Sequence, residues 1–285
     1  MPPPLIELAG ESGAPPLHLA PANGFPPRTY APLLSKLSAF RSVCLPPRAL
    51  WGDQAPPTEY RDWHADADDL LAGFVAHDLR EVLALGHSLG GVVSMLALLK
   101  APERFKALIM LDPPILLPDM LAVIRAAWDG GYIDQMPLVH GALRRRQVFA
   151  SREEAFERFR QKPLFADWSD ESLWLYIEHG TRKRSNGDEF ELLWSTDWEA
   201  HYFSTVYLQI WEDLPLLTES PPALLVRGGA SGTLVAEAFE RVQSLAPALD
   251  CIELAKQGHL FPLAAPQETA MLILGWLNSK RSPGQ

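Results

Sequence analysis

Cysteine is scarce in this 285-residue chain: only Cys44 and Cys251 are present, so a framework of several disulfides is excluded. Both lie in short apolar runs, where we expect buried free thiols. Reduced cysteines are typical of the cytoplasm, and we expect a cytoplasmic protein. Long apolar runs are also missing, since none approaches the roughly 18 residues that span a bilayer. The N-terminus lacks the basic segment and apolar run of a secretory signal.

Basic residues are outnumbered: Lys and Arg total 25 against 35 Asp and Glu, which gives a net charge of −10 at pH 7. A nucleic-acid interface needs a basic face, and an anionic membrane surface attracts one. The histidines, cysteines and carboxylates do not recur at metal-ligand spacing. Gly90 and Gly91 follow an apolar run but lack the rest of a G-x-G-x-x-G motif. We therefore expect no metal, no other cofactor, and neither a nucleic-acid nor a membrane partner.

Short apolar runs alternate with longer helical patterns in the first 114 residues and again after residue 220. This alternation predicts βαβ units and therefore an α/β fold, with a mostly parallel sheet flanked by helices. Continuous apolar runs are typical of strands that are buried on both faces. The expected strands cover residues 5–8, 17–20, 42–45, 81–85, 107–111, 223–226 and 251–254. The expected helices cover residues 59–76, 88–100, 234–245 and 269–277.

The stretch between these two parts contains helical patterns but no convincing strand. Helices are expected at 117–128 and 197–210, and two more begin after Ser151 and Ser169, which are typical N-cap residues. The stretch also holds six of the nine tryptophans, which pack together or roof an apolar pocket. We therefore expect two domains: an α/β core formed by residues 1–114 and 220–285, and a helical cap formed by residues 115–219.

The strongest local signal is Gly86-His87-Ser88-Leu89-Gly90, which matches the G-x-S-x-G nucleophile elbow. The serine of this motif sits on a sharp turn between a strand and a helix. The flanking positions must be glycine because a Cβ there would clash. The strand expected at 81–85 and the helix expected at 88–100 supply this context, so Ser88 is the candidate nucleophile.

With this elbow and the alternating pattern around it, the chain resembles an α/β-hydrolase with a helical cap over nearly its whole length. The resemblance implies an oxyanion hole formed by the backbone N–H groups of Leu89 and Phe25, the latter in the turn Ala22-Asn23-Gly24-Phe25-Pro26. Asn23 stands where many members of the family carry histidine. The resemblance also implies that His259, after the last strand, is the general base, because imidazole takes and returns a proton near neutral pH.

In the family, an acidic residue completes a catalytic triad with the serine and the histidine. The position of this acid in the present sequence departs from the family pattern. In the family it usually lies in the turn after the next-to-last strand, here residues 227–233, and Gly232 occupies the place of the expected aspartate. Some members carry the acid one strand earlier, and that position is Asp112, directly after the strand expected at 107–111. We therefore expect Asp112 to orient the imidazole of His259. The alternative is a weaker Ser–His dyad.

The resemblance implies a serine hydrolase that cleaves a carboxylic ester of a small to medium apolar substrate through an acyl-enzyme. Two alternatives remain open: hydrolysis of a carbon–carbon bond with similar residues, and a catalytically weak ligand-binding protein on the same fold. Epoxide hydrolases and haloalkane dehalogenases use an aspartate nucleophile, so Ser88 sets those reactions aside.

Two other features have simpler expectations. His87 lies within the elbow and is expected to point away from the chemistry. The run Arg144-Arg145-Arg146 is expected to solvate a surface of the cap, and its alternative role is to meet an anionic substrate.

Overall fold

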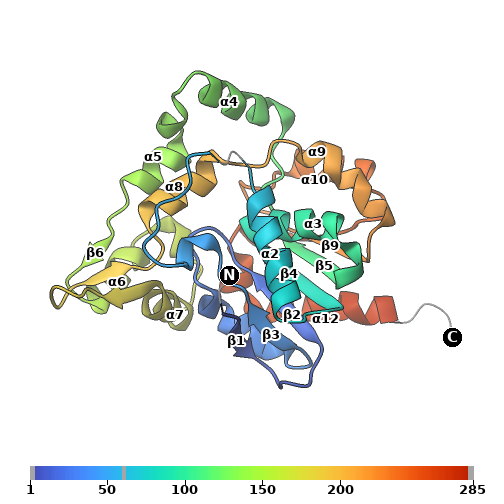
Figure 1. The fold of residues 1–285 in the computed structure, drawn as a ribbon, viewed down its shortest axis with the longest axis horizontal. Coiled ribbons are helices and arrows are strands. Elements are labelled where there is room, and N and C mark those ends of the chain that lie inside the picture. Colours follow the sequence, from blue (N-terminus) through green and yellow to red (C-terminus); the bar gives the residue numbers. More distant parts are fainter. Residues whose placement is uncertain (1–3, 60–61, 282–285) are drawn as a thin grey trace.

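A computed structural model describes residues 4–59 and 62–281 of the chain. At its centre lies a seven-stranded sheet with the strand order β1-β3-β2-β4-β5-β9-β10 (Figure 1). β1 runs antiparallel to β3, and the other neighbours are parallel, as the alternating pattern predicts. The strands are β1 (Ile6–Ala9), β2 (Pro16–Ala20), β3 (Arg41–Cys44), β4 (Val82–His87), β5 (Phe105–Leu111), β9 (Ala223–Gly228) and β10 (Asp250–Leu254).

The central strands are buried on both faces. Because side chains along a strand alternate between the two faces, Val82 and Ala84 of β4 lie in one apolar cluster, and Leu83 and Leu85 lie in the other. Every residue of β4 and β9 is buried. The continuous apolar runs of the sequence therefore reflect a sheet that is covered on both sides.

Helices cover each face of the sheet. α2, α3 and α10 pack on the face to which Val82 points, and α1, α11 and α12 pack on the opposite face. Figure 1 labels α2, α3, α10 and α12 around the sheet. The helix expected at 59–76 begins at His64, and residues 60 and 61 lie outside the described residues. The helices of the core are α1 (Ala31–Leu34), α2 (His64–Ala76), α3 (Leu89–Lys100), α10 (Ala236–Leu245), α11 (Phe261–Ala264) and α12 (Pro266–Arg281).

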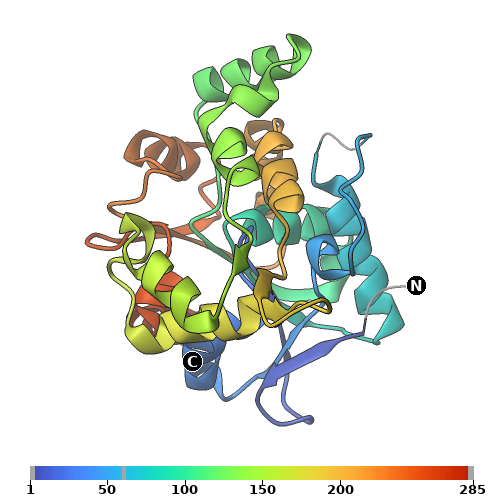
Figure 2. The ribbon, with the colours of Figure 1, turned by 90° about the vertical axis from the view of Figure 1, so that its left-hand side faces the viewer.

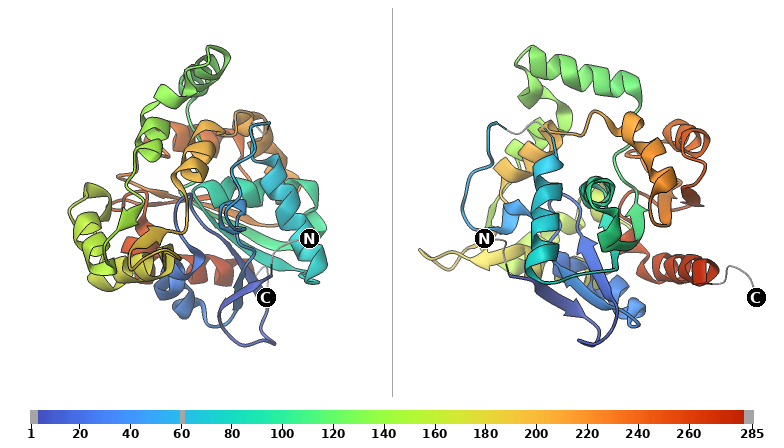
Figure 3. Two further views of the ribbon diagram at one scale, coloured as in Figure 1. Left: turned by 60° about the vertical axis from the view of Figure 1, so that its left-hand side comes forward. Right: turned by 45° about the vertical axis from the view of Figure 1, so that its right-hand side comes forward.

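The segment between β5 and β9 leaves the sheet and forms a cap lobe, coloured from green through yellow to orange (Figure 2 and Figure 3). Most of its buried apolar side chains belong to the same two clusters as those of the core. The lobe contacts the loop that follows β2, where Nδ2 of Asn23 donates to the carbonyl oxygen of Glu199 at 2.9 Å. It therefore adjoins the carboxyl ends of the parallel strands. Its helices are α4 (Pro118–Asp129), α5 (Pro137–Leu143), α6 (Arg152–Arg160), α7 (Asp170–Gly180), α8 (Thr196–Ser204) and α9 (Ile210–Asp213).

The cap also contains a small antiparallel sheet with the order β6-β8-β7, so the expectation of a cap without strands is wrong. Its strands are β6 (Val148–Phe149), β7 (Thr181–Lys183) and β8 (Phe190–Leu192). These strands, of two or three residues each, are too short to show an apolar alternation. Arg182 on β7 lies opposite Glu191 on β8, with Nε and Oε1 2.8 Å apart, and such cross-strand pairs stabilise short strands. The small sheet does not continue the central one.

Two of the predicted helix starts in the cap are confirmed. The hydroxyl oxygen of Ser151 accepts a hydrogen bond from the N–H of Glu154 at 3.2 Å. The hydroxyl oxygen of Ser169 accepts one from the N–H of Ser172 at 3.1 Å. Each serine thus satisfies a backbone donor that the first turn of its helix leaves unpaired.

The single helix expected at 197–210 is instead two, α8 and α9. α8 ends at Ser204, where the hydroxyls of Ser204 and Thr205 both donate to the carbonyl oxygen of His201, at 2.9 and 2.8 Å. Side-chain bonds of this kind compete with helical hydrogen bonding, which accounts for the break.

Both cysteines are free. Cys44 is buried, whereas Cys251 is only half-buried, so the expectation of a buried thiol holds for the first alone. Within the described part of the chain, no helix is long and apolar enough to cross a membrane. The same residues contain no group of three or more histidine, cysteine or acidic side chains that could hold a metal ion.

Candidate active site

Ser88 lies at the turn between β4 and α3. Its backbone has φ 54° and ψ −121°, a conformation that residues other than glycine rarely adopt and that costs about 1–3 kcal/mol. A Cβ at Gly86 would lie 2.3 Å from the carbonyl oxygen of Gly90, and a Cβ at Gly90 would lie 2.1 Å from that of Ala20. The turn therefore needs glycine at both positions, as expected for an elbow, and Ser88 itself stays half-buried.

Asp112 and His259 come together although they are far apart in the sequence. Nδ1 of His259 lies 2.7 Å from Oδ2 of Asp112. Asp112 directly follows β5 and is fully buried, whereas the side chain of His259, in the loop after β10, is 24% exposed. Because a carboxylate accepts the Nδ1 proton, Nε2 is left as the proton acceptor of the ring. The contact is the one expected for Asp112, and its catalytic role stays a prediction.

Two further donors hold the Asp112 carboxylate. The N–H of Gly228 donates to Oδ1 at 2.9 Å, and the hydroxyl of Ser231 donates to Oδ2. Both donors belong to the end of β9 and the turn after it, in which Gly232 replaces the usual aspartate. A buried carboxylate is stable only when its oxygens are hydrogen-bonded, so this turn stabilises the Asp112 side chain. Sequence reasoning missed Ser231, although it lies one position before the glycine that drew attention to the turn.

The hydroxyl of Ser88 and the ring of His259 are not joined by a hydrogen bond within the part of the chain that the structure describes. His259 uses Nδ1 for Asp112, and its carbonyl oxygen accepts from Nε2 of His87 at 3.0 Å. In free enzymes the bond between nucleophile and base is often long, and it shortens when substrate binds. The geometry is therefore compatible with Ser88 and His259 acting together.

His87 does not point away from this group of residues, which corrects the expectation from the sequence. Its ring is fully buried. One ring nitrogen contacts the hydroxyl of Tyr30 at 2.7 Å, and the other contacts the carbonyl oxygen of His259. The alternation of side chains in β4 directs His87 into the protein, beside the loop that carries His259.

The two N–H groups expected to form the oxyanion hole differ in their surroundings. Leu89 is the first residue of α3, so its N–H has no carbonyl partner within the helix. The N–H of Phe25 donates to the carbonyl oxygen of Ala22 at 3.1 Å and closes a turn in which Gly24 has φ 83°. The N–H of Phe25 therefore has an internal partner, and contact with an oxyanion requires that this bond be shared or released.

A largely buried ion pair of the cap lies against this turn. Nη1 of Arg145 is 2.5 Å from Oε2 of Glu199, and the two side chains are 13% and 15% exposed. A Cβ on Gly24 would lie 3.7 Å from Nη1 of Arg145. The expectation that the arginine run solvates a surface is therefore wrong for Arg145, while Arg144 and Arg146 are exposed. Three successive side chains on an irregular backbone do not share one face, so their environments differ.

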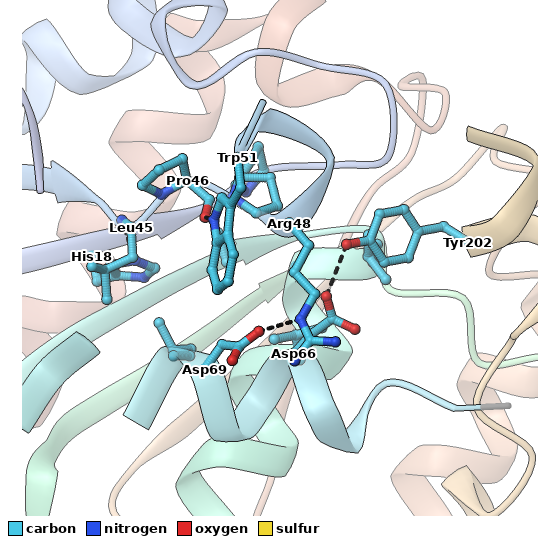
Figure 4. A pocket seen from close by; sticks show the side chains of 15 residues that line it. His18, Leu45, Pro46, Arg48, Trp51, Asp66, Asp69 and Tyr202 are labelled. Atoms are coloured by element: carbon cyan, nitrogen blue, oxygen red, sulfur yellow. Dashed lines mark hydrogen bonds and ion pairs between the residues drawn. The ribbon is translucent and has the colours of Figure 1, made fainter. Parts of the chain in front are cut away.

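A cavity of about 50 Å³ lies between α2 and the start of α3 (Figure 4). It adjoins residues 22–26, which we call the oxyanion turn after the role expected of them. Leu89 lines it, whereas Ser88 and His259 do not. At its polar end the hydroxyl of Tyr202 reaches from the cap and donates to Oδ1 of Asp66 at 2.8 Å (Figure 4). Its apolar wall is formed by Ala20, Pro21, Leu45, Leu70, Gly90 and Val93. A cavity of this size holds a few water molecules or a short alkyl group.

Residues 19–272 match the model of the alpha/beta hydrolase family. This range covers most of the chain and includes Ser88, Asp112 and His259. The chain therefore belongs to the α/β hydrolase family, and the predicted fold is confirmed. Ethanol acetyltransferase 1 of Hanseniaspora uvarum is 35% identical over 65 residues, which is 22% of this chain and 20% of that protein. The match thus spans about a fifth of the relative's length.

Solved structures share the fold over nearly the whole chain. E-2-(acetamidomethylene)succinate hydrolase superposes with a TM-score of 0.76 at 19% identity, covering 96% of this chain and 94% of its own. An esterase of Mycobacterium tuberculosis has a TM-score of 0.72 at 18% identity, with coverage of 98% and 93%. The thioesterase domain from the curacin biosynthetic pathway has a TM-score of 0.70 at 19% identity, with coverage of 95% and 94%. At these identities the similarity shows a common fold.

Proposed function

We propose that this α/β hydrolase cleaves carboxylic esters of small to medium apolar acids through an acyl-enzyme on Ser88. The observation that carries the proposal is the 2.7 Å contact between Nδ1 of His259 and the buried carboxylate of Asp112. It leaves Nε2 as a base, and the strained elbow supplies a serine at the end of the neighbouring strand. Nucleophile, base and acid are the three groups that serine-based acyl transfer needs.

In the proposed reaction, Nε2 of His259 takes the hydroxyl proton as Oγ of Ser88 attacks the ester carbonyl carbon. The bond from this carbon to the alcohol oxygen then breaks, and the imidazolium returns the proton to the leaving alkoxide. Water attacks the acyl-enzyme in the same way, with His259 again taking and returning the proton, and the acid is released. Asp112 keeps the imidazole in its Nδ1–H tautomer and stabilises the positive charge that forms.

The developing oxyanion would be stabilised by backbone donors. The N–H of Leu89 is available at the start of α3. The N–H of Phe25 would turn from the carbonyl oxygen of Ala22 toward the oxyanion, or divide its hydrogen bond between the two. A single donor of this kind is worth about 3 kcal/mol of transition-state stabilisation. One preformed donor is therefore enough to give substantial catalysis.

Within this range of substrates, we propose a preference for short acyl chains. The cavity that adjoins Leu89 measures about 50 Å³ and has an apolar wall. A longer chain would have to extend beyond this cavity, toward the adjoining one of about 190 Å³ that shares Arg48 and Trp51 with it. The partial match to an ethanol acetyltransferase is compatible with a small acyl group.

The other functions proposed from the sequence are less well supported. A weak ligand-binding protein would be favoured by an incomplete site, but the acid and base are in contact. Carbon–carbon bond hydrolysis uses similar residues, and no contact described above favours it over ester cleavage. Ester hydrolysis is therefore the function to test first.

The test is hydrolysis of p-nitrophenyl acetate, butyrate and octanoate by the wild type and two variants. Ser88→Ala should lose all but a few per cent of the activity, because the nucleophile is gone. Ser94→Ala is the matched control, since Ser94 lies on α3, the helix that follows Ser88, is buried, and has a hydroxyl with no hydrogen-bond partner in the described part of the chain. It should keep the activity of the wild type, with acetate and butyrate preferred over octanoate. Substantial hydrolysis by Ser88→Ala, or none by the wild type, would contradict the proposal.

A further inference from the structure

His87 is the centre of a chain of hydrogen bonds next to the proposed active site. Its Nδ1 lies 2.7 Å from the hydroxyl of Tyr30, and its Nε2 lies 3.0 Å from the carbonyl oxygen of His259. The Tyr30 oxygen in turn accepts from the N–H of Ala22 at 3.0 Å. His87 and Tyr30 are both fully buried, so water does not compete for these contacts.

The direction of each bond follows from the groups at its ends. A carbonyl oxygen only accepts hydrogen bonds. Nε2 of His87 therefore carries a proton and donates a hydrogen bond to the carbonyl oxygen of His259. A backbone N–H only donates, so the Tyr30 oxygen accepts from Ala22 and its own proton goes to Nδ1 of His87. The neutral Nε2–H tautomer of His87 makes all these bonds at once. Burial, together with the neighbouring His259, holds the pKa of His87 well below its usual value, which agrees with a neutral ring.

The chain of bonds links three segments that the proposed mechanism uses. Ala22 begins the oxyanion turn after β2, His87 ends β4 just before the nucleophile, and His259 lies in the loop after β10. β2 and β4 are neighbours in the sheet, but β10 is an edge strand separated from β4 by β5 and β9. Strand pairing therefore does not connect the loop of His259 directly to the elbow. The hydrogen bond from His87 to the carbonyl oxygen of His259 makes that connection.

The bond from His87 also holds His259 at a second point. Asp112 holds Nδ1 of the ring, and His87 holds the carbonyl oxygen of the same residue. With the ring alone anchored, a shift of the loop would change the distance from Nε2 to Ser88. With the backbone anchored as well, the ring keeps one position relative to the nucleophile.

We propose that Tyr30 and His87 are positioning residues, which hold the loop of His259 and the oxyanion turn in the geometry that ester hydrolysis requires. This inference rests on the proposed function. Neither residue contacts the reacting atoms of the proposed reaction. Tyr30 acts through Ala22, and His87 acts through His259. A displacement of about 1 Å in a catalytic group can lower the rate roughly 100-fold, so loss of these bonds should be visible in kcat.

Two substitutions of His87 separate positioning from packing. His87→Leu has a similar volume and removes both hydrogen bonds, whereas His87→Gln keeps an amide N–H for His259 and an oxygen for Tyr30. We expect His87→Leu to lower kcat at least about tenfold with little change in KM, and His87→Gln to recover most of that loss. Rates are expressed per active site by titration with a fluorophosphonate, so that a lower yield of folded protein has no influence.

Tyr30→Phe breaks the same chain of bonds and should lower kcat in the same way. Tyr207→Phe is its matched control, because Tyr207 is also a buried residue, and its hydroxyl donates to Asp213 at 2.5 Å and takes no part in the chain of bonds. If the hydroxyls serve stability alone, both variants will unfold at lower temperature and keep their kcat. Unchanged kcat in Tyr30→Phe and His87→Leu would overturn the proposal.

Nitrogen NMR of the histidine rings tests the same contacts without a substrate. The signal of His87, identified by its loss in His87→Gln, should show the neutral Nε2–H tautomer from about pH 5 to 8. A charged ring or the Nδ1–H tautomer at pH 7 would contradict the chain of bonds even in an active esterase. The expected tautomer in a protein that cleaves no ester would support the chain of bonds and overturn ester hydrolysis instead.

Discussion

Asp112 combines three unusual properties in one residue. Its backbone has φ 45°, its side chain is fully buried, and its carboxylate accepts hydrogen bonds from His259, Gly228 and Ser231. Strained backbone and buried charge both destabilise a fold and persist where the surroundings hold them in place. This concentration at the end of β5 supports the proposed role of Asp112 as the acid of the triad.

Replacement of Asp112 by asparagine should lower kcat on the order of 10⁴-fold with little change in KM. The amide can donate to Nδ1 of His259, which favours the tautomer whose Nε2 cannot accept the proton of Ser88. Substrate binding does not use this residue, so the loss should fall on kcat. Steady-state kinetics with p-nitrophenyl acetate measure it. A near-normal kcat would make Asp112 a structural residue and favour a Ser–His dyad.

The double variant Asp112→Asn, Gly232→Asp is the matched rescue. A Cβ at Gly232 would have no neighbour within 4 Å, and Gly232 does not have the positive φ that excludes side chains. A carboxylate at the usual family position should therefore restore part of kcat. Failure to restore any activity would mean that position 232 does not reach His259.

At the scale of single residues, the sequence was informative where a motif demands particular residue types. The glycines around Ser88 and the histidine after the last strand indicated their positions directly. Ser231 and the contacts of His87 could not be inferred, because a hydroxyl and an imidazole have many roles and only the folded chain brings them to Asp112 and His259.

At the scale of elements, α2 of the core and α8 of the cap meet at Asp66, a half-buried acid that lines the cavity. The hydroxyl of Tyr202 on α8 donates to Asp66 on α2 at 2.8 Å. The pKa of Asp66 is raised to about 6, because the effect of burial, which raises it, is larger than the effect of the hydrogen bond from Tyr202, which lowers it. An unfolded aspartate has a pKa of about 3.9, so between about pH 4 and 6 the folded protein binds more protons than the unfolded one. The contribution of Asp66 to stability therefore falls as pH rises through this range.

Asp66→Asn should gain stability relative to the wild type as pH rises. The amide oxygen can still accept from Tyr202, but the cost of burying a charge is gone. We expect the difference in free energy of unfolding to shift by roughly 2 kcal/mol in favour of the variant between about pH 4 and 7. Urea denaturation at several pH values measures it. Asp68→Asn is the control, since Asp68 lies on the same helix with a 63% exposed side chain. Parallel pH curves for wild type and Asp66→Asn would contradict the prediction.

The elements of the core were more predictable than those of the cap. The strands of the core, such as β4 and β9, are buried apolar runs, so their amino-acid composition alone predicts their burial. The cap strands depend on side-chain pairs such as Arg182 with Glu191. These residues are far enough apart in the sequence that only the folded chain brings them into contact. The break between α8 and α9 likewise comes from hydroxyls that also occur within helices.

For the molecule as a whole, the parallel sheet explains why distant residues meet. The carboxyl ends of β4, β5, β9 and β10 lie along one edge of the sheet, so Ser88, Asp112 and His259 are gathered there. This arrangement follows from the alternating strand and helix pattern and was predictable. The contact of the cap with the oxyanion turn, through Arg145 and Glu199, was not predictable from the sequence. It depends on how the cap packs against the core.

The central claim is that Ser88 forms an acyl-enzyme, and the most direct measurement is the site of acylation. The protein is mixed with p-nitrophenyl butyrate, quenched in acid within the first turnovers, and its peptides are analysed by mass spectrometry. We predict one butyryl group per chain, on the peptide that contains Ser88, and none on the Ser88→Ala variant. A butyryl group on another residue, or ester turnover without any acylated peptide, would contradict the account.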